Sequence, residues 1–228
     1  AAMPGPAGPW DGLSVLVTAG GTREPIDSVR FIGNRSSGRM GVALAEAARR
    51  RGASVTLVAA NVSVPVSPAI RVVPVETAAE LAAATRDAFG AADVLLMAAA
   101  VADFRPERAD GKLAREGSGG MDLRLTETED VVASLAAERR PDQTLVGFAA
   151  EHGAEAISRA RSKLERKGLD AIVFNDISRS EIGFDSERNE VTIVTREDER
   201  AVPEGSKGEI AETVLDSVGI LRGVRTHT

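Results

Sequence analysis

The sequence predicts an α/β fold in which helices cover both faces of a mainly parallel, doubly wound sheet. Three observations lead to this prediction. Short apolar runs rich in β-branched residues alternate with helix-length amphipathic segments along most of the chain. The first apolar run ends in a pair of glycines, as a buried strand entering a tight turn does. Near the C-terminus, two strand-like runs follow one another without a helix between them.

The expected elements follow in chain order. Strands are predicted at residues 14–18, 55–58, 71–75, 94–97, 144–148 and 171–174. Helices are predicted from Ser37 to the arginines before Gly52, and over residues 77–88, 130–138 and 154–167. Thr77, followed three residues later by Glu80, marks a helix start. The end of the chain predicts a hairpin of residues 190–195 and 200–202, then a helix over 207–219. We therefore expect a Rossmann-like domain with a C-terminal antiparallel β-hairpin extension.

The domain organisation predicted from this pattern is simple. Residues 1–12 contain three prolines among alanine and glycine and are expected to be a linker or cloning remnant. Residues 13–222 are expected to form one domain, and residues 223–228 a tail. The stretch from 103 to about 126 is polar, rich in glycine and longer than a usual connection. We interpret it as a mobile active-site loop.

The composition excludes several kinds of chemistry. The chain has no cysteine and two histidines, which excludes a disulfide, a thiolate nucleophile and a Cys/His zinc site. The formal net charge of −6 disfavours general nucleic-acid binding, but clustered arginines and lysines can still hold a phosphorylated small molecule. The apolar runs are too short for a bilayer crossing, and no leader opens the chain. We expect a cytoplasmic protein with neither nucleic-acid nor membrane partners.

Two segments near the N-terminus carry candidate site residues. Gly20 and Gly21 follow the first strand, at the edge where an α/β sheet presents its ligand site, although they are equally compatible with a plain turn. Residues 29–41 bring backbone amides, Ser36, Ser37 and three arginines to a helix start, which suits a phosphate. The alternative is that one serine caps the helix and the arginines are solvated.

Several separated motifs resemble the signature of the phosphopantothenoylcysteine synthetases, the bacterial kind often fused behind a decarboxylase domain. The resemblance covers nearly the whole chain, from about Leu13 to Gly219. The segments that carry it are residues 18–27, 29–41, 97–104, Lys112, 146–151, Lys163 with Lys167, and 174–176 followed by 183–184. The fold implied by the family agrees with the fold that the pattern predicts.

The resemblance implies a role for individual residues. Asn34 and Lys112 are the expected catalytic residues, since an amide can donate to a carbonyl oxygen that gains charge and a loop lysine can meet phosphates. Gly20, Gly21, Arg30, Ser36, Ser37 and Ala99 are the expected substrate-binding residues. The expected nucleotide-binding residues are Asp103, Lys112, Phe148, Lys163, Lys167 and Phe184, and Asp103 is also the candidate metal ligand.

Plain structural roles compete with some of these assignments. Asp103 can cap the turn that follows its strand, Lys112 can be an ordinary surface lysine, and Lys163 can belong to the polar face of its helix.

The implied reaction joins 4′-phosphopantothenate to L-cysteine in coenzyme A biosynthesis, through an acyl-cytidylate made from CTP. Mg²⁺ or Mn²⁺ is the implied cofactor, and no flavin is expected in this domain. The family also implies a homodimer with sites shared between subunits and an N-terminal decarboxylase domain in the full-length protein. The preference for CTP over ATP depends on the resemblance alone.

Two other functions compete with this interpretation. An NAD(P)-dependent oxidoreductase uses the same kind of sheet, but the chain has neither the glycine fingerprint of such enzymes nor any tyrosine. A nucleotide-binding regulator without catalysis remains open. The presence of Asn34 and Lys112 favours an enzyme over that regulator.

Overall fold

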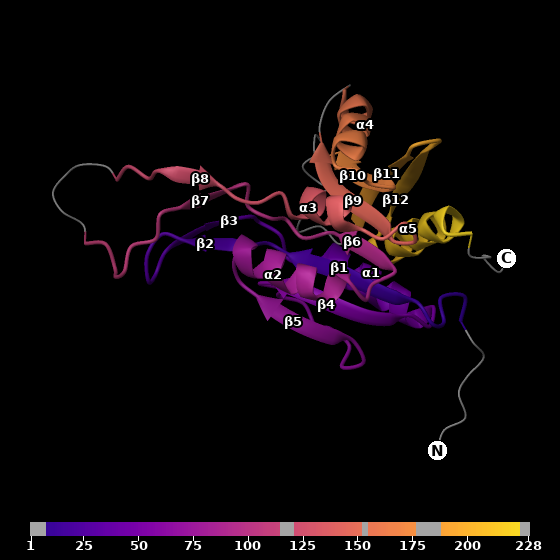
Figure 1. Ribbon diagram of the computed structural model, residues 1–228, viewed down its shortest axis with the longest axis horizontal. Coiled ribbons are helices and arrows are strands. Elements are labelled where there is room, and N and C mark those ends of the chain that lie inside the picture. The colour runs from indigo at the N-terminus through magenta and orange to yellow at the C-terminus, as the bar shows by residue number, and fades with distance from the viewer. Residues whose placement is uncertain (1–7, 115–120, 152–154, 177–187, 224–228) are drawn as a thin grey trace, which may run out of the picture.

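The protein is described by a computed structural model that covers residues 8–114, 121–151, 155–176 and 188–223. The main sheet has the strand order β12-β11-β10-β9-β6-β1-β4-β5 (Figure 1). Its strands are β1 (Ser14–Gly20), β4 (Ser54–Ala60), β5 (Arg71–Val75), β6 (Val94–Met97), β9 (Thr144–Glu151), β10 (Ala171–Asp176), β11 (Arg188–Thr195) and β12 (Glu199–Ser206). The neighbours from β5 to β10 pair in parallel, and β10, β11 and β12 pair antiparallel. The predicted fold class is confirmed.

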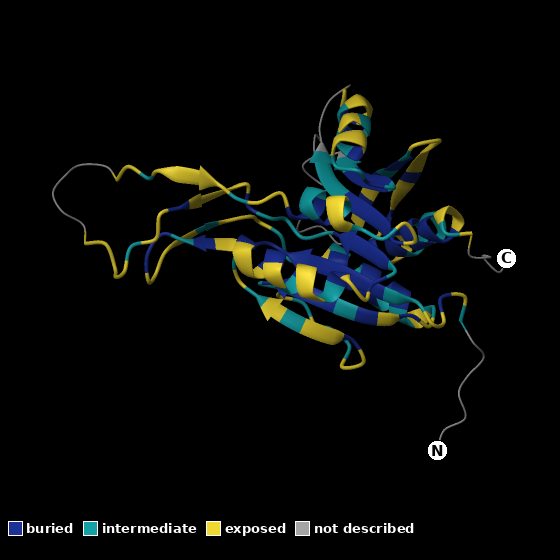
Figure 2. Cartoon of the chain, viewed as in Figure 1, coloured by how far each residue is buried: buried dark blue, intermediate teal, exposed yellow. Residues whose placement is uncertain are grey.

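Helices cover both faces of this sheet because successive strand residues point to opposite sides. They are α1 (Arg39–Arg50), α2 (Ala78–Phe89), α3 (Val131–Glu138), α4 (Ala156–Arg166) and α5 (Lys207–Leu221). In β1, Val15 and Val17 pack into the core layer beneath α1 and α5. Leu16, between them, packs into the layer beneath α2, α3 and α4. The central strands of the sheet are therefore buried on both faces, whereas the edge strands β5 and β12 are largely exposed (Figure 2).

Four short strands form an extension that the sequence did not predict. β2 (Arg23–Pro25) pairs with β3 (Phe31–Gly33), and β7 (Phe104–Pro106) pairs with β8 (Leu125–Glu127), both antiparallel. These strands and the described residues between them, which we call the arm, project from the sheet and are largely exposed (Figures 1 and 2). The stretch expected to be a mobile loop thus has paired ends. Its mobility stays a prediction, because residues 115–120 lie outside the described part.

The N-terminal boundary lies earlier than predicted. Trp10 falls inside the stretch expected to be a linker, yet it is only 1% exposed and belongs to the core beneath α1 and α5. Its amide donates to the carbonyl oxygen of Arg51 at 3.0 Å, and the Arg51 guanidinium lies 5.8 Å from the centre of its ring. Burial of a large aromatic side chain stabilises this segment against the domain, so the packed chain begins before residue 13.

Candidate active site

The carboxyl ends of β1, β6 and β9 converge on the backbone that follows β6. Two buried threonines fix that backbone. The amide of Ala99 donates to Oγ1 of Thr18 at 3.1 Å, and the amide of Ala102 donates to Oγ1 of Thr22 at 2.9 Å. Both threonines have zero exposure. The segment from Ala99 to Ala102 is therefore held rigidly where an α/β sheet binds its ligands.

A cavity of about 390 Å³ opens beside this segment, and we call it the Asn34 cavity. Most of the residues expected to bind the nucleotide or to act in catalysis meet there. Those lining the cavity are Asn34, Ala99, Asp103, Phe148, Lys163 and Lys167. They come from the residue after β3, from the segment after β6, from β9 and from α4 and its C-cap, so distant stretches of sequence converge on one place.

Asn34 holds a position from which its side-chain amide can donate. Its Nδ2 donates one hydrogen bond to the carbonyl oxygen of Ala100 at 3.0 Å, and the residue is exposed at the cavity. An amide nitrogen carries two N–H groups, so a second donor remains for a ligand. The bond to Ala100 orients that donor before any ligand arrives.

The charged groups of the Asn34 cavity are partly paired. Nζ of Lys167 lies 2.9 Å from a carboxylate oxygen of Asp130, and Glu129 pairs with Arg86. A hydrogen bond from Ser134, reinforced by Arg86, lowers the pKa of Glu129. Asp103 is exposed and has no ion-pair or hydrogen-bond partner for its carboxylate among the described residues. Its carboxylate is therefore available to a ligand.

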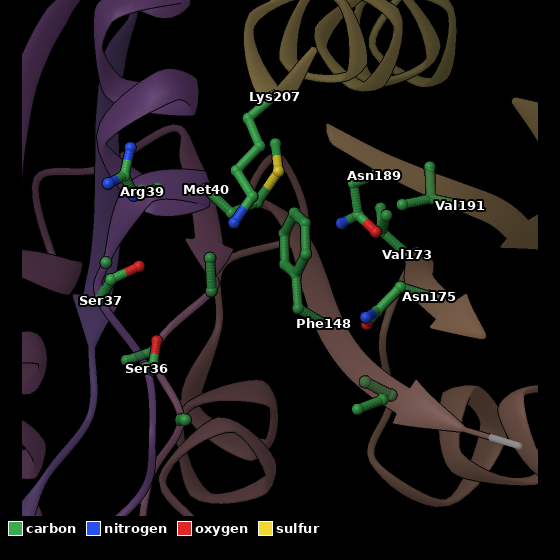
Figure 3. Close-up of a pocket in the computed structure, with 16 residues that line it drawn as sticks. Ser36, Ser37, Arg39, Met40, Phe148, Val173, Asn175, Asn189, Val191 and Lys207 are labelled. Carbon is green, nitrogen blue, oxygen red and sulfur yellow. The ribbon is translucent and has the colours of Figure 1, made fainter. Parts of the chain in front are cut away.

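A second cavity of about 150 Å³, the Lys207 cavity, adjoins the first. Ala99, Ala100 and residues 148–150 line both, so the Phe148 ring stands between the two spaces. Figure 3 shows Ser36, Ser37 and Arg39 on one side, Asn175 and Asn189 on the other, and the Lys207 side chain reaching in toward Met40 and Phe148. Lys207 is only 9% exposed. Hydroxyls, amides and a buried ammonium together suit an oxygen-rich anion.

Neither Ser36 nor Ser37 caps α1, so the capping role that the sequence left open for them is excluded. The N-cap is Gly38 in a left-handed conformation with φ of 82°, and no side chain bonds the first turn. The two serines precede the cap and line the Lys207 cavity instead. Because the first-turn amides of a helix lack partners within it, this end of α1 adds donors and a positive dipole to the cavity wall.

Arg30 and Lys112 lie apart from the other candidate residues. They line a hollow of about 530 Å³ on the arm together with Val29, Leu113 and Ala114, which we call the Arg30 hollow. Neither residue lines the Asn34 cavity or the Lys207 cavity. Within the described part of one chain, these two cations are therefore not brought to Asn34, and their roles stay predictions.

Gly20 and Gly21 allow close backbone packing behind the site. A Cβ atom on Gly20, whose φ is +88°, would lie 1.9 Å from the carbonyl oxygen of Ala60, and one on Gly21 would lie 2.7 Å from that of Asn34. Neither glycine lines a cavity described above, so direct contact with substrate stays a prediction. Phe184, expected at the nucleotide, lies outside the described residues.

The carboxylates of the site suit a metal ion carried by phosphates better than a protein-bound ion. Among the described residues, no three carboxylate or histidine side chains gather into a cluster that could hold a metal. Mg²⁺ in nucleotide sites takes one or two carboxylates and fills its remaining positions with phosphate and water oxygens. The unpaired Asp103 fits that arrangement.

Comparison with known proteins assigns the chain to a family. Residues 10–221 match the family described as the DNA/pantothenate metabolism flavoprotein C-terminal domain. The chain belongs to this family. Among similar proteins, the coenzyme A biosynthesis bifunctional protein CoaBC of Mycobacterium bovis is 43% identical over 223 residues, covering 92% of this chain and 53% of that protein. CoaBC of Bacillus subtilis is 40% identical over 215 residues, covering 93% and 52%.

A third relative has a different name. A protein from an unknown prokaryotic organism, named cysteine/cysteine sulfinic acid decarboxylase, is 45% identical over 212 residues, covering 92% of this chain and 59% of that protein. The chain thus spans little more than half the length of the relatives it matches.

Solved structures of similar proteins agree with the fold. The C-terminal domain of CoaBC matches with a TM-score of 0.78 and 32% identity, covering 94% of this chain and 97% of that one. The H337A mutant of Cab2 in complex with phosphopantothenate-cysteine matches with a TM-score of 0.73 at 16% identity, a likeness of fold alone. In addition, none of the described helices is both long and apolar enough to cross a membrane.

Sequence reasoning missed several residues of this family member's site. Lys207 gave no signal, because a buried lysine at a helix start looks like any other lysine in a sequence. Asn189 lies on a strand predicted only as part of a hairpin. Thr18 and Thr22 were identified within a motif, but their hydroxyl bonds to the segment after β6 depend on tertiary contacts.

Proposed function

We propose that this chain is the ligase module that condenses 4′-phosphopantothenate with L-cysteine in coenzyme A biosynthesis, using CTP to activate the carboxylate. The observation that carries the proposal is the convergence of Asn34, Asp103, Phe148, Lys163 and Lys167 on one cavity. The names of the CoaBC relatives support the pathway.

In the first step, a carboxylate oxygen of phosphopantothenate attacks the α-phosphorus of the nucleotide, and pyrophosphate leaves. The protein contributes positioning and neutralisation of charge, which dominate catalysis of phosphoryl and nucleotidyl transfer. Phe148 offers a ring face to the base, and Lys163 and Lys167 offer charge to the nucleotide. The end of α1, with Ser36, Ser37 and Lys207, suits the departing phosphates.

In the second step, the amine of cysteine attacks the acyl carbon, and CMP leaves while the nitrogen loses a proton. Negative charge builds on the carbonyl oxygen in the transition state. We assign the free N–H of Asn34 to that oxygen, since its orientation is already fixed by Ala100.

A divalent cation, Mg²⁺ or Mn²⁺, would be held by Asp103 and the nucleotide's phosphates. When bound it supplies Lewis-acid neutralisation of phosphate charge. Asp103 itself orients the nucleotide by accepting hydrogen bonds. We expect no flavin in this module.

A homodimer would explain the position of the Arg30 hollow. The arm exposes a set of large apolar side chains, namely Val29, Phe31, Phe104, Met121 and Leu125. Apolar side chains gathered on one projecting element are typical of a protein interface. We propose that two chains associate through their arms, so that Arg30 and Lys112 of one chain reach the Asn34 cavity of the other.

The remaining half of the relatives suggests a second module. We propose that the full-length protein carries an N-terminal phosphopantothenoylcysteine decarboxylase domain and that it acts in the cytoplasm. The decarboxylase name of one relative is consistent with such a second activity in the half that this chain does not match.

Pyrophosphate release tests the proposed activity. We expect the protein to release pyrophosphate from CTP when phosphopantothenate and Mg²⁺ are present, much less from ATP or UTP, and to form amide product only when cysteine is added. Asn34→Asp, which has the same size but no amide donor, serves as the matched variant. Folded protein that releases no pyrophosphate with any triphosphate would instead support the nucleotide-binding regulator.

A further inference from the structure

The Arg30 hollow is organised around one buried carboxylate, that of Asp27. Its Oδ1 accepts the backbone N–H groups of Val29 at 2.8 Å and Arg30 at 2.7 Å. Its Oδ2 accepts Nε of Arg30 at 2.9 Å, Nη2 of the same guanidinium, and the backbone N–H of Leu113 at 3.1 Å. Asp27 is 3% exposed. One carboxylate thus collects donors from the turn between β2 and β3 and from the segment that follows β7.

The same contacts fix the Arg30 guanidinium and the backbone next to Lys112. Nη2 of Arg30 donates onward to the carbonyl oxygen of Leu113 at 2.8 Å, so Arg30 and Asp27 together bind both backbone groups of the residue next to Lys112. A backbone bond from Ala109 to the carbonyl oxygen of Ile26, at 2.9 Å, joins the two segments a second time. Residues more than eighty positions apart are therefore held side by side.

The two cations keep donors for a ligand despite this bonding. Among the described residues, Nη1 of Arg30 has no hydrogen-bond partner, and neither has the exposed ammonium of Lys112. The two positive charges in the hollow repel each other. The ionised Asp27 carboxylate, which accepts backbone N–H groups from both segments, offsets part of that repulsion. A guanidinium held in advance, next to a fixed backbone that carries an ammonium, suits a phosphate monoester, because less conformational entropy is lost on binding.

We propose that Asp27 is a positioning residue that holds Arg30 and the Lys112 segment as one preformed acceptor for the phosphorylated end of the acyl substrate. The choice of ligand rests on the proposed function, whereas the positioning does not. Asp27 itself does not touch the substrate, because its oxygens are already occupied by the donors named above.

Asp27→Asn tests this role, with Asp170→Asn as the matched control. Asp170 likewise makes a bidentate pair with an arginine, Arg139 at 2.6 and 3.1 Å, and accepts one backbone N–H, that of Leu145 at 2.8 Å. Asp170 immediately precedes β10 and lines none of the three cavities described above. Each variant loses an ion pair with an arginine. Only Asp27→Asn also loses the bonds that hold the two segments of the Arg30 hollow together.

The first measurement is hydrogen exchange of the two bonded amides of this segment, those of Ala109 and Leu113. We expect these amides to exchange at least tenfold faster in Asp27→Asn than in the parent, and at the parental rate in Asp170→Asn, since loss of a charged acceptor removes a bond of that strength. Equal exchange in the parent and in Asp27→Asn would overturn the positioning role. This measurement needs no substrate, so its result is separate from the fate of the ligase assignment.

The second measurement is the KM for phosphopantothenate in pyrophosphate release. We expect about a tenfold rise in Asp27→Asn with little change in the KM for CTP, and no rise in Asp170→Asn. Asp27→Asn combined with Arg30→Ala should raise this KM by less than the product of the two single effects, because Asp27 acts partly through Arg30 and partly through Leu113. Additive effects, or equal KM values in both aspartate variants, would contradict the proposal.

A second variant covers the case in which Asp27→Asn does not fold. Leu113→Pro removes the N–H that donates to Asp27 and leaves the pair of Asp27 with Arg30 intact. We expect it to release Lys112, with a raised KM for phosphopantothenate and a melting temperature lowered by less than in Asp27→Asn, since it loses one of the bonds to Asp27 and not all of them. An unchanged KM for phosphopantothenate in this variant would contradict the proposal, because the bond between Leu113 and Asp27 would then not position a group that binds the substrate.

Discussion

At the residue scale, Asn34 and Asp27 have different roles, although both are small polar side chains. Asn34 directly follows β3, and Asp27 lies in the turn between β2 and β3. Asn34 is exposed and keeps one donor for a ligand, whereas Asp27 is buried and its oxygens are taken up by neighbours in the arm. The exposed donor of Asn34 suits a group that contacts the reacting atoms, and the buried carboxylate of Asp27 suits a group that holds other residues in place. Their substitutions should therefore fail in different ways.

Replacing Asn34 should affect turnover and leave the fold intact. We expect Asn34→Ala and Asn34→Asp each to lower kcat by about 100- to 1,000-fold, the usual effect of losing one donor to a developing oxyanion. The melting temperature should change little, because the side chain is exposed and makes one described hydrogen bond. Steady-state kinetics with a thermal melt checks both parts. A kcat near the parental value in either variant would remove Asn34 from the catalytic step.

Asp27 should make stability depend on acid pH. Its hydrogen bond with the Arg30 guanidinium, helped by backbone bonds from Val29, Arg30 and Leu113, lowers its pKa in the folded protein below the ordinary 3.8. A lowered folded pKa stabilises the protein above the unfolded value, and that stabilisation is lost as pH falls through the folded value. We expect the free energy of unfolding to fall more steeply below about pH 4 in the parent than in Asp27→Asn. Urea titrations across pH 2.5 to about 6 measure this, and parallel curves would contradict it.

Residue roles in the site were only partly predictable from the sequence. The meeting of Asn34, Phe148, Lys163 and Lys167 at one cavity could be predicted, because family motifs and strand ends point to the same edge of the sheet. Their chemical roles stay predictions. The function of Asp27 could not, since its partner Leu113 is 86 residues away and no local pattern links them. Lys207 likewise could not be identified, because the start of α5 reaches the site only through the tertiary packing of α5 beside α1.

At the element scale, the position of α1 depends on a glycine that lets the helix approach β1. A Cβ atom on Gly41 would lie 2.4 Å from Cβ of Ala19 and 2.9 Å from the carbonyl oxygen of Thr18. Contacts that short force backbone movement. The N-terminal turn of α1 forms part of the Lys207 cavity, so such movement should also reach the site.

Gly41→Ala should therefore destabilise the protein, by about 1–3 kcal/mol, the usual cost of overpacking. It should also raise the KM for the nucleotide, since Met40 and Ser37 move with the helix end. Gly90→Ala is the matched control, because Gly90 has an ordinary helical conformation and nothing lies within 4 Å of its added Cβ. We expect Gly90→Ala to be neutral or slightly stabilising. Equal urea midpoints for the two variants would contradict the close approach.

The main elements were more predictable than the arm. The strand at 94–97 matches the predicted bounds, and Thr77 with Glu80 forms the predicted capping box of α2. The strands of the arm have only three residues each and are largely exposed, so they show no apolar alternation to identify them. Their pairing is set by contacts between distant segments, which a local pattern does not contain.

At the scale of the whole molecule, the candidate site residues lie in two separate places, the Asn34 cavity and the Arg30 hollow. The Asn34 cavity is lined by residues at and after the ends of the sheet strands, and the Arg30 hollow by residues between the strands of the arm. The arm projects from the sheet (Figure 1). In the proposed function, a second copy of the chain brings Arg30 and Lys112 to the Asn34 cavity, and the exposed apolar side chains of the arm offer a surface for it.

Sedimentation tests this arrangement. We expect the parent to sediment as a dimer, and Phe31→Glu, which places a charge on a side chain that is 50% exposed on the arm, to sediment as a monomer with less than about a tenth of the activity. Val72→Glu changes an apolar residue that is 41% exposed on β5, away from the arm, and should remain an active dimer. A parent that is monomeric and fully active at assay concentrations would rule out shared sites.

In the proposed reaction a nucleotide activates the carboxylate of phosphopantothenate. Transfer of an oxygen isotope measures that step most directly. Phosphopantothenate labelled with ¹⁸O in its carboxylate is converted in the presence of CTP and cysteine, and the products are weighed by mass spectrometry. Attack on the α-phosphorus predicts one ¹⁸O atom in CMP and none in pyrophosphate. Label in inorganic phosphate or pyrophosphate, or product formed without label in CMP, would contradict the acyl-cytidylate.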